Sequence, residues 1–160
     1  MKKFMTVDLC DKYRGSIQAA SPVFRMYGGI PSFSGQIETV KCYEDNTVVR
    51  QTLSTPGKGR VLVVDAGASL KCALVGDAVA GIAAKHGWAG IVLNGCVRDV
   101  AAINKVKIGI RALNHVPLAS DKHGLGVVGV PVVFAGVNFA PGHYLYCDIA
   151  GIVVSEKPLE

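Results

Sequence analysis

The sequence predicts an α/β fold in which a β-α-β-α-β core carries an additional β layer. Two continuous apolar runs, over residues 60–65 and 90–93, are typical of strands buried on both faces. An alanine-rich stretch over residues 78–86 separates these runs and predicts a crossover helix. From residue 127 onward the chain consists of short apolar segments divided by glycine and proline, which predicts the second β layer.

The first third of the chain mixes helix with strand. We expect a helix over residues 6–13 with Thr6 as its cap, and strand structure over residues 36–43. Asp45-Asn46 then offers a turn or an N-cap before a second helical segment, residues 47–53.

The core begins with the strand over residues 60–65 and the small-residue loop 66–69 that follows it. Gly76-Asp77 opens the predicted helix and Gly87 ends it, so the helix has a capping residue at each end. Taken by itself, Asp77 is most simply explained as the N-cap.

The second core strand starts at residue 90 and is expected to break at Asn94-Gly95. A short helix over residues 100–104 and a third strand over residues 108–113 complete the series. In such a series we expect three parallel strands with right-handed crossovers.

The last third of the chain predicts four strands, and these cover residues 127–134, 137–139, 144–148 and 151–154. Pro131 cannot donate a backbone hydrogen bond, so the first of these strands is expected at a sheet edge or with a bulge. His143 follows a Pro-Gly pair and is expected in a turn.

Composition restricts the class of protein. A chain of 160 residues with 50% hydrophobic and 18% charged residues fits one folded domain over residues 1–160 and excludes intrinsic disorder. Charged residues interrupt every apolar run well before the ~18 residues that a membrane span needs. The first residues carry no apolar run of secretory length, because Asp8 and Asp11 interrupt it. We therefore expect a cytoplasmic protein without a membrane association.

The basic surplus does not indicate a nucleic-acid interface. The net charge is +5, but the lysines and arginines are scattered along the chain. No recognition-helix, zinc-finger or aromatic base-stacking pattern accompanies them. We therefore expect no direct binding of nucleic acid.

Five cysteines stand at wide, irregular spacings, and the four histidines form no ligand pair. This pattern predicts neither a zinc site nor a disulfide framework. Most of the cysteines are expected to be small buried residues. Cys96 lies beside the candidate site, but no nearby histidine in the sequence is available to activate it as a nucleophile.

Two segments are expected at the carboxyl ends of the core strands, where open parallel sheets bind ligands. The first leads to the helix start, where the backbone amides of Gly76, Asp77, Ala78 and Val79 could hold a carboxylate. The second contains Arg98-Asp99, in which the guanidinium can pair with a carboxylate or carbonyl oxygen.

The Asp99 carboxylate suits a hard divalent cation such as Mg²⁺, held largely through waters. Such a cation would polarise a 2-keto group and stabilise an enolate. The pattern suits a small dicarboxylate or keto acid, while an adjacent Arg-Asp pair is also common in plain surface turns.

Five stretches run in order along nearly the whole chain, and these are TVDLCD (6–11), YGGIPSFSGQIETVKCYEDN (27–46), GKGRVLVVDAGAS (57–69), GCVRDV (95–100) and PGHYLYCDIAGIVV (141–154). In them the sequence resembles the family that contains the regulator of ribonuclease activity A and the 4-hydroxy-4-methyl-2-oxoglutarate aldolases. The resemblance implies a swivelling β/β/α fold in a ring-shaped homotrimer, with active sites near the subunit interfaces.

The aldolase branch of this family is a divalent-metal lyase with the pattern D-x20-R-D, which this chain matches at Asp77, Arg98 and Asp99. By this resemblance residues 76–79 and Arg98 bind substrate, and Arg98 also steadies the developing enolate. Asp99 serves Mg²⁺ or Mn²⁺, and Asp77 positions a water that delivers a proton. The expected reactions are cleavage of 4-hydroxy-4-methyl-2-oxoglutarate to two pyruvates and decarboxylation of oxaloacetate, both through a metal-bound enolate.

Two positions depart from the aldolase pattern: Ala102 stands where an acidic residue often follows, and His143 stands where aspartate is common. The length and the 27–46 segment are similar to the regulator branch, although that branch tends to lose the aspartate that this chain keeps at Asp99. The alternative hypothesis is therefore a non-catalytic protein that binds and inhibits an RNA-degrading endoribonuclease.

Overall fold

The apolar run after Arg60 forms the central strand of the fold, and four consecutive valine and leucine residues in it are fully buried. The computed structural model describes residues 3–160, so Met1 and Lys2 of the predicted domain lie outside the described residues. Its helices are α1 (Thr6–Lys12), α2 (Thr47–Leu53), α3 (Asp77–Lys85) and α4 (Val100–Ile103).

The strands are β1 (Ile17–Ala19), β2 (Arg25–Tyr27), β3 (Phe33–Lys41), β4 (Val61–Asp65), β5 (Ala73–Val75), β6 (Gly90–Val97), β7 (Gly109–His115), β8 (Val127–Val128), β9 (Val132–Phe134), β10 (Val137–Phe139), β11 (Tyr144–Asp148) and β12 (Gly151–Ser155). The main sheet has the order β1-β12-β11-β3-β4-β6-β7-β2, with β5 paired to β6 and β8 paired to β3. β4, β6 and β7 are parallel, as the sequence predicts.

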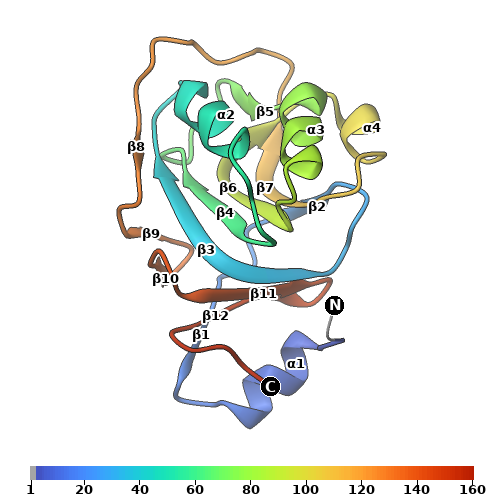
Figure 1. Ribbon diagram of the computed structural model, residues 1–160, viewed down its shortest axis with the longest axis vertical. Coiled ribbons are helices and arrows are strands. Elements are labelled where there is room, and N and C mark those ends of the chain that lie inside the picture. The colour runs from blue at the N-terminus through green and yellow to red at the C-terminus, as the bar shows by residue number, and fades with distance from the viewer. Residues whose placement is uncertain (1–2) are drawn as a thin grey trace.

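The sheet is curled, and the long strand β3 joins its two halves (Figure 1). Helices α2, α3 and α4 lie at the end of the molecule that contains the parallel strands, and β11, β12 and β1 form the second layer (Figure 1). One apolar core packs the parallel strands against α2 and α3. A second core lies between β3, β4, β9, β10, β11 and β12. The predicted α/β architecture with an additional β layer is thus confirmed.

Three local predictions were wrong. Thr6 does not cap α1 through its own side chain, because its N–H and its hydroxyl both donate to the Asp148 carboxylate at 2.7 and 2.6 Å. Asn94-Gly95 does not end the second core strand; β6 continues to Val97 with a register irregularity between Leu93 and Cys96. The predicted 127–134 strand is two strands, and Pro131 stands between them.

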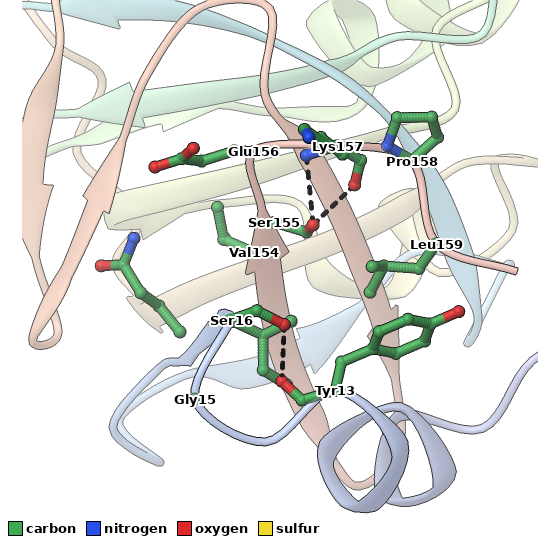
Figure 2. Close-up of a pocket in the computed structure, with 11 residues that line it drawn as sticks. Tyr13, Gly15, Ser16, Val154, Ser155, Glu156, Lys157, Pro158 and Leu159 are labelled. Atoms are coloured by element: carbon green, nitrogen blue, oxygen red, sulfur yellow. Dashed lines mark hydrogen bonds between the residues drawn. The ribbon is translucent and has the colours of Figure 1, made fainter.

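The C-terminal residues lie against the end of α1 and against β11. The Tyr13 hydroxyl donates to the Glu160 carbonyl at 2.9 Å, and the Leu159 N–H donates to the Tyr146 hydroxyl at 2.7 Å. Figure 2 shows the cavity that this segment and the end of α1 enclose. Among the described residues, no helix is both long and apolar enough to cross a membrane.

Candidate functional site

The predicted site residues converge where the parallel strands β4 and β6 end, which we call the carboxyl edge. Because the two strands are paired in parallel, the loop after Asp65 and the segment after Val97 emerge at the same edge. The Arg98 N–H donates to the Val75 carbonyl at 3.0 Å, which ties the Arg98 backbone to the strand that leads into α3. The start of α3 and the Arg98-Asp99 pair are therefore neighbours.

The N-terminus of α3 contacts the Asp99 carboxylate directly. The Asp77 N–H donates to Asp99 Oδ2 at 3.4 Å, and the Ala78 N–H donates to Asp77 Oδ1 at 2.9 Å. The N-cap is Gly76, so the prediction of Asp77 as the N-cap was wrong: Asp77 is the first residue of the helix. Two of the four amides predicted to hold a substrate carboxylate thus bond protein carboxylates in this structure.

Gly76 leaves room for the Asp99 carboxylate to lie close to the helix N-terminus. A Cβ added at position 76 would lie 2.6 Å from Asp99 Oδ2, well inside van der Waals contact. A side chain at this position would push the carboxylate away from the helix N-terminus. The glycine therefore permits the juxtaposition on which the site depends.

Arg98 and Asp99 are only loosely paired. Arg98 Nε lies 3.8 Å from Asp99 Oδ2, and both side chains are 42% exposed. Asp99 has φ +53° and ψ +45°, the left-handed conformation that few residues other than glycine, asparagine and aspartate adopt. This backbone conformation, uncommon for a residue with a side chain, directs the chain into α4 immediately after the pair.

A cavity of about 70 Å³ lies at the carboxyl edge, and all six predicted site residues line it: Gly76, Asp77, Ala78, Val79, Arg98 and Asp99. Three further polar residues that the sequence reasoning missed also line it, namely Asn46, Arg50 and Lys122. Asn46 and Arg50 come from the start of α2, and Lys122 comes from the segment between β7 and β8. Only the tertiary fold brings these residues to the strand ends.

The donor set fits a hydrated hard cation. Within residues 3–160, no group of three or more histidine, cysteine, aspartate or glutamate side chains is placed to hold a metal. Mg²⁺ does not need such a group, because it usually keeps several waters and takes one or two carboxylates together with substrate oxygens. The half-exposed Asp99 carboxylate can supply such a ligand, with Asp77 on the same cavity.

Neither Cys96 nor the larger cavity near the C-terminus contributes a reactive group to this site. Cys96 is 1% exposed, and burial raises the pKa of its thiol, which keeps it in the protonated, unreactive form. The cavity at the chain ends is larger, about 590 Å³, but its lining includes none of the predicted site residues (Figure 2). Its Ser155 hydroxyl already bonds the backbone of Lys157.

Known proteins resemble this chain over nearly its full length. A family model described as RraA-like, Aldolase/RraA, matches residues 6–154. A Pseudomonas putida (strain W619) protein named "Putative 4-hydroxy-4-methyl-2-oxoglutarate aldolase" is 50% identical over 160 residues, which are 100% of this chain and 98% of that protein.

Two solved structures have the same fold. The S-adenosylmethionine:2-dimethylmenaquinone methyltransferase from Geobacillus kaustophilus HTA426 has a TM-score of 0.95 and 44% identity, and the match covers 98% of this chain and 97% of that one. The RNA-processing inhibitor RraA from Thermus thermophilis has a TM-score of 0.95 and 40% identity, with 99% and 96% covered.

These three names describe three different activities on one fold, so the fold alone does not determine the activity. The activity of this chain has to be inferred from the residues at the carboxyl edge. The similarity itself extends from α1 to β12 and includes every residue of the site. The chain belongs to the RraA-like family.

Proposed function

We propose that the protein is a divalent-metal-dependent lyase that cleaves 4-hydroxy-4-methyl-2-oxoglutarate into two pyruvates and decarboxylates oxaloacetate. The observation that supports this most is the convergence of the α3 N-terminus, Arg98 and Asp99 on one small cavity. Relatives with the name "Putative 4-hydroxy-4-methyl-2-oxoglutarate aldolase" support the choice of substrate class.

Both reactions require the same assistance, because both leave an electron pair on C3 of a pyruvyl group. A bound Mg²⁺ or Mn²⁺ would polarise the 2-keto oxygen and stabilise the enolate charge. Asp99 is the residue that would hold this cation. The α3 N-terminus would hold the C1 carboxylate through its dipole and through the amides of Gly76 and Val79, which bond no protein carboxylate among the described residues.

Arg98 is placed to hold substrate and to balance charge that develops on the keto oxygen. Its weak 3.8 Å pairing with Asp99 leaves most of its donors free for a ligand. In the retro-aldol reaction the C3–C4 bond breaks, the C4 hydroxyl loses a proton and C3 gains one. The Asp77 carboxylate lines the cavity, and in this proposal it holds the water that moves this proton.

The function is tested by pyruvate release from the two keto acids with Mg²⁺ present. We expect wild type to release pyruvate from both, and Asp99→Ala to lose at least about 100-fold in rate, the range seen when a charge-stabilising group is removed. Pyruvate release by Asp99→Ala at the wild-type rate would contradict the proposed role of Asp99.

A second candidate function is supported by the RNA-processing inhibitor that shares this fold at 40% identity. In this function the protein binds and inhibits an RNA-degrading endoribonuclease through its outer surface, without catalysis. A pull-down with such a nuclease discriminates the two, because Asp99→Ala should spare surface binding while it abolishes lyase activity. For either function we propose a homotrimer of three 16.8 kDa chains, which light scattering would measure.

A further inference from the structure

We propose that Arg50 and Lys122 bind the second carboxylate of the substrate, and that they make the site selective for dicarboxylate over monocarboxylate 2-keto acids. This inference rests on the proposed function, since it assigns a specificity role within the same site. Neither residue belongs to the D-x20-R-D pattern.

Both cations line the same cavity as Arg98 and Asp99. Arg50 lies in α2, and Lys122 lies in the segment that follows β7. Both are exposed, and within the described residues neither forms an ion pair with a carboxylate. Their charges are therefore available to a ligand.

The backbone on the Arg50 side is held in place. The Asn46 side-chain amide donates to the Leu74 carbonyl at 2.9 Å, next to the start of α3. The Arg50 N–H donates to the Asn46 carbonyl at 3.0 Å, one helical turn later. The base of the Arg50 side chain is thus fixed relative to the site.

The backbone on the Lys122 side is held equally well. The Ser120 N–H donates to the Ala73 carbonyl at 3.2 Å, and the His123 N–H donates to the Asp45 carboxylate at 2.6 Å. These bonds lie on both sides of Lys122, so the residue projects from an ordered segment. Ordered cations lose less entropy when they bind a ligand than cations on a free loop.

The size of the cavity indicates which part of the substrate these cations meet. At about 70 Å³ it has room for roughly five water-sized groups, since one water needs ~15 Å³. That is enough for a pyruvyl group beside Arg98 and Asp99, whereas the second carboxylate of 4-hydroxy-4-methyl-2-oxoglutarate, at the far end of its five-carbon chain, must extend beyond it. The exposed side chains of Arg50 and Lys122 are the cations available there.

The charge balance agrees with this assignment. Three cations, Arg50, Arg98 and Lys122, face two carboxylates, Asp77 and Asp99, which leaves one positive charge in excess. A divalent cation and a dicarboxylate cancel each other, so their joint binding preserves this balance. A monocarboxylate would leave Arg50 and Lys122 without a counter-charge and would lose their contribution to affinity.

Two non-cleavable ligands of the same carbon skeleton test the proposal: 2-oxoglutarate, with two carboxylates, and 2-oxopentanoate, with one. Calorimetry with Mg²⁺ present would measure the Kd of each. We expect wild type to bind 2-oxoglutarate about tenfold more tightly, from two solvent-exposed ionic contacts. Arg50→Gln/Lys122→Gln should reduce this ratio to about one and leave the Kd of 2-oxopentanoate unchanged.

Arg14→Gln/Lys107→Gln is the matched control, because it removes the same charge from two exposed positions outside the cavity. It should keep the tenfold ratio. Equal affinity of wild type for both ligands, or an unchanged ratio in Arg50→Gln/Lys122→Gln, would overturn the proposal while the keto-acid site stands. If wild type binds neither ligand, the proposed function fails, and this inference fails with it.

Discussion

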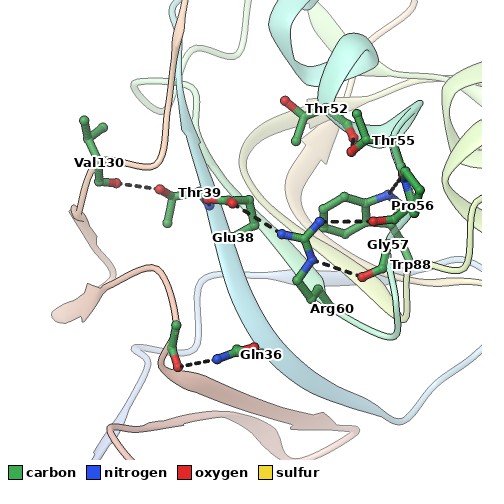
Figure 3. Close-up of polar contacts among 11 residues, drawn as sticks. Gln36, Glu38, Thr39, Thr52, Thr55, Pro56, Gly57, Arg60, Trp88 and Val130 are labelled. Atoms are coloured by element: carbon green, nitrogen blue, oxygen red, sulfur yellow. Dashed lines mark hydrogen bonds and ion pairs between the residues drawn. The ribbon is translucent and has the colours of Figure 1, made fainter.

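Arg60 and Arg98 lie at opposite ends of the parallel strands, and their surroundings differ in nearly every respect. Arg60 precedes β4, at what we call the amino edge of the sheet (Figure 3). Its Nε and Nη2 donate to the carbonyls of Gly57 and Pro56 at 3.1 Å each, and its Nη1 lies 3.4 Å from Glu38 Oε2. Its guanidinium also stacks over the Trp88 ring at 4.7 Å.

Arg98, at the carboxyl edge, has one partner for its side chain among residues 3–160, the Asp99 carboxylate at 3.8 Å. The difference separates a structural arginine from one that is available to bind. At the amino edge Arg60 holds the loop before β4 against Glu38 of β3 and against Trp88, whereas at the carboxyl edge most donors of the Arg98 guanidinium remain free. We infer that the carboxyl edge is arranged for a ligand and the amino edge for stability.

Arg98→Lys would test this contrast with the largest effect. A lysine keeps the charge but cannot reproduce the planar fork of a guanidinium, so pyruvate release should fall about 100-fold. The free energy of unfolding should stay within about 0.5 kcal/mol of wild type, because the Arg98 side chain is 42% exposed and only loosely paired with Asp99. Steady-state kinetics and urea unfolding measure the two quantities. A large loss of stability would show that Arg98, like Arg60, stabilises the fold.

Gly76→Ala should have a smaller effect on activity, about tenfold. The added methyl would lie 2.6 Å from Asp99 Oδ2 and must displace that carboxylate. Gly81→Ala is the matched control, because a Cβ there meets no atom within 4 Å and alanine suits a helix interior. If Gly76→Ala keeps full activity, the contact between the helix N-terminus and Asp99 has no role in the reaction.

Arg60→Lys should show the reverse pattern. It removes the bonds to Gly57 and Pro56 and weakens the stack on Trp88, which should lower the free energy of unfolding by about 1–2 kcal/mol. The kcat/KM for pyruvate release should stay within about twofold of wild type. A kinetic loss as large as that of Arg98→Lys would show that the two edges are not functionally distinct.

The smallest expected effect is on the stability of the protein in acid, to which Asp45, near the carboxyl edge, contributes. Burial raises the pKa of Asp45, but hydrogen bonds from Thr47, His123 and Leu125 outweigh it and hold this pKa at about 2. Since the unfolded pKa is about 3.9, the contribution of Asp45 is fully present above about pH 5 and is lost progressively as the pH falls to about 2. Thermal unfolding across this range should give a flatter profile for Asp45→Asn than for wild type.

Local sequence patterns predict most of the core. The buried run of β4, the helix after Gly76 and the parallel strands follow from hydrophobicity and turn residues. Asn94-Gly95 misleads because it is a turn signal inside a strand; the Asn94 amide instead donates to Asp65 Oδ1 at 3.0 Å on the neighbouring strand. The short strand β5 has too few residues to show a period.

The site residues also fall into a group that local sequence patterns predict and a group that they do not. Asp77, Arg98 and Asp99 are predictable because the order of strands and helices places them at one edge. Arg50 and Lys122 are not, because hydrogen bonds between distant segments bring them there. Thr6 is a further case, since its partner Asp148 is 142 positions away in the sequence.

The central claim, that the carboxyl edge is a metal-dependent lyase site, is tested most directly by metal removal. Pyruvate release from 4-hydroxy-4-methyl-2-oxoglutarate would be measured after EDTA treatment and again after Mg²⁺ is restored. We predict that activity disappears with EDTA and returns with Mg²⁺. Pyruvate release that continues unchanged in EDTA would contradict the account.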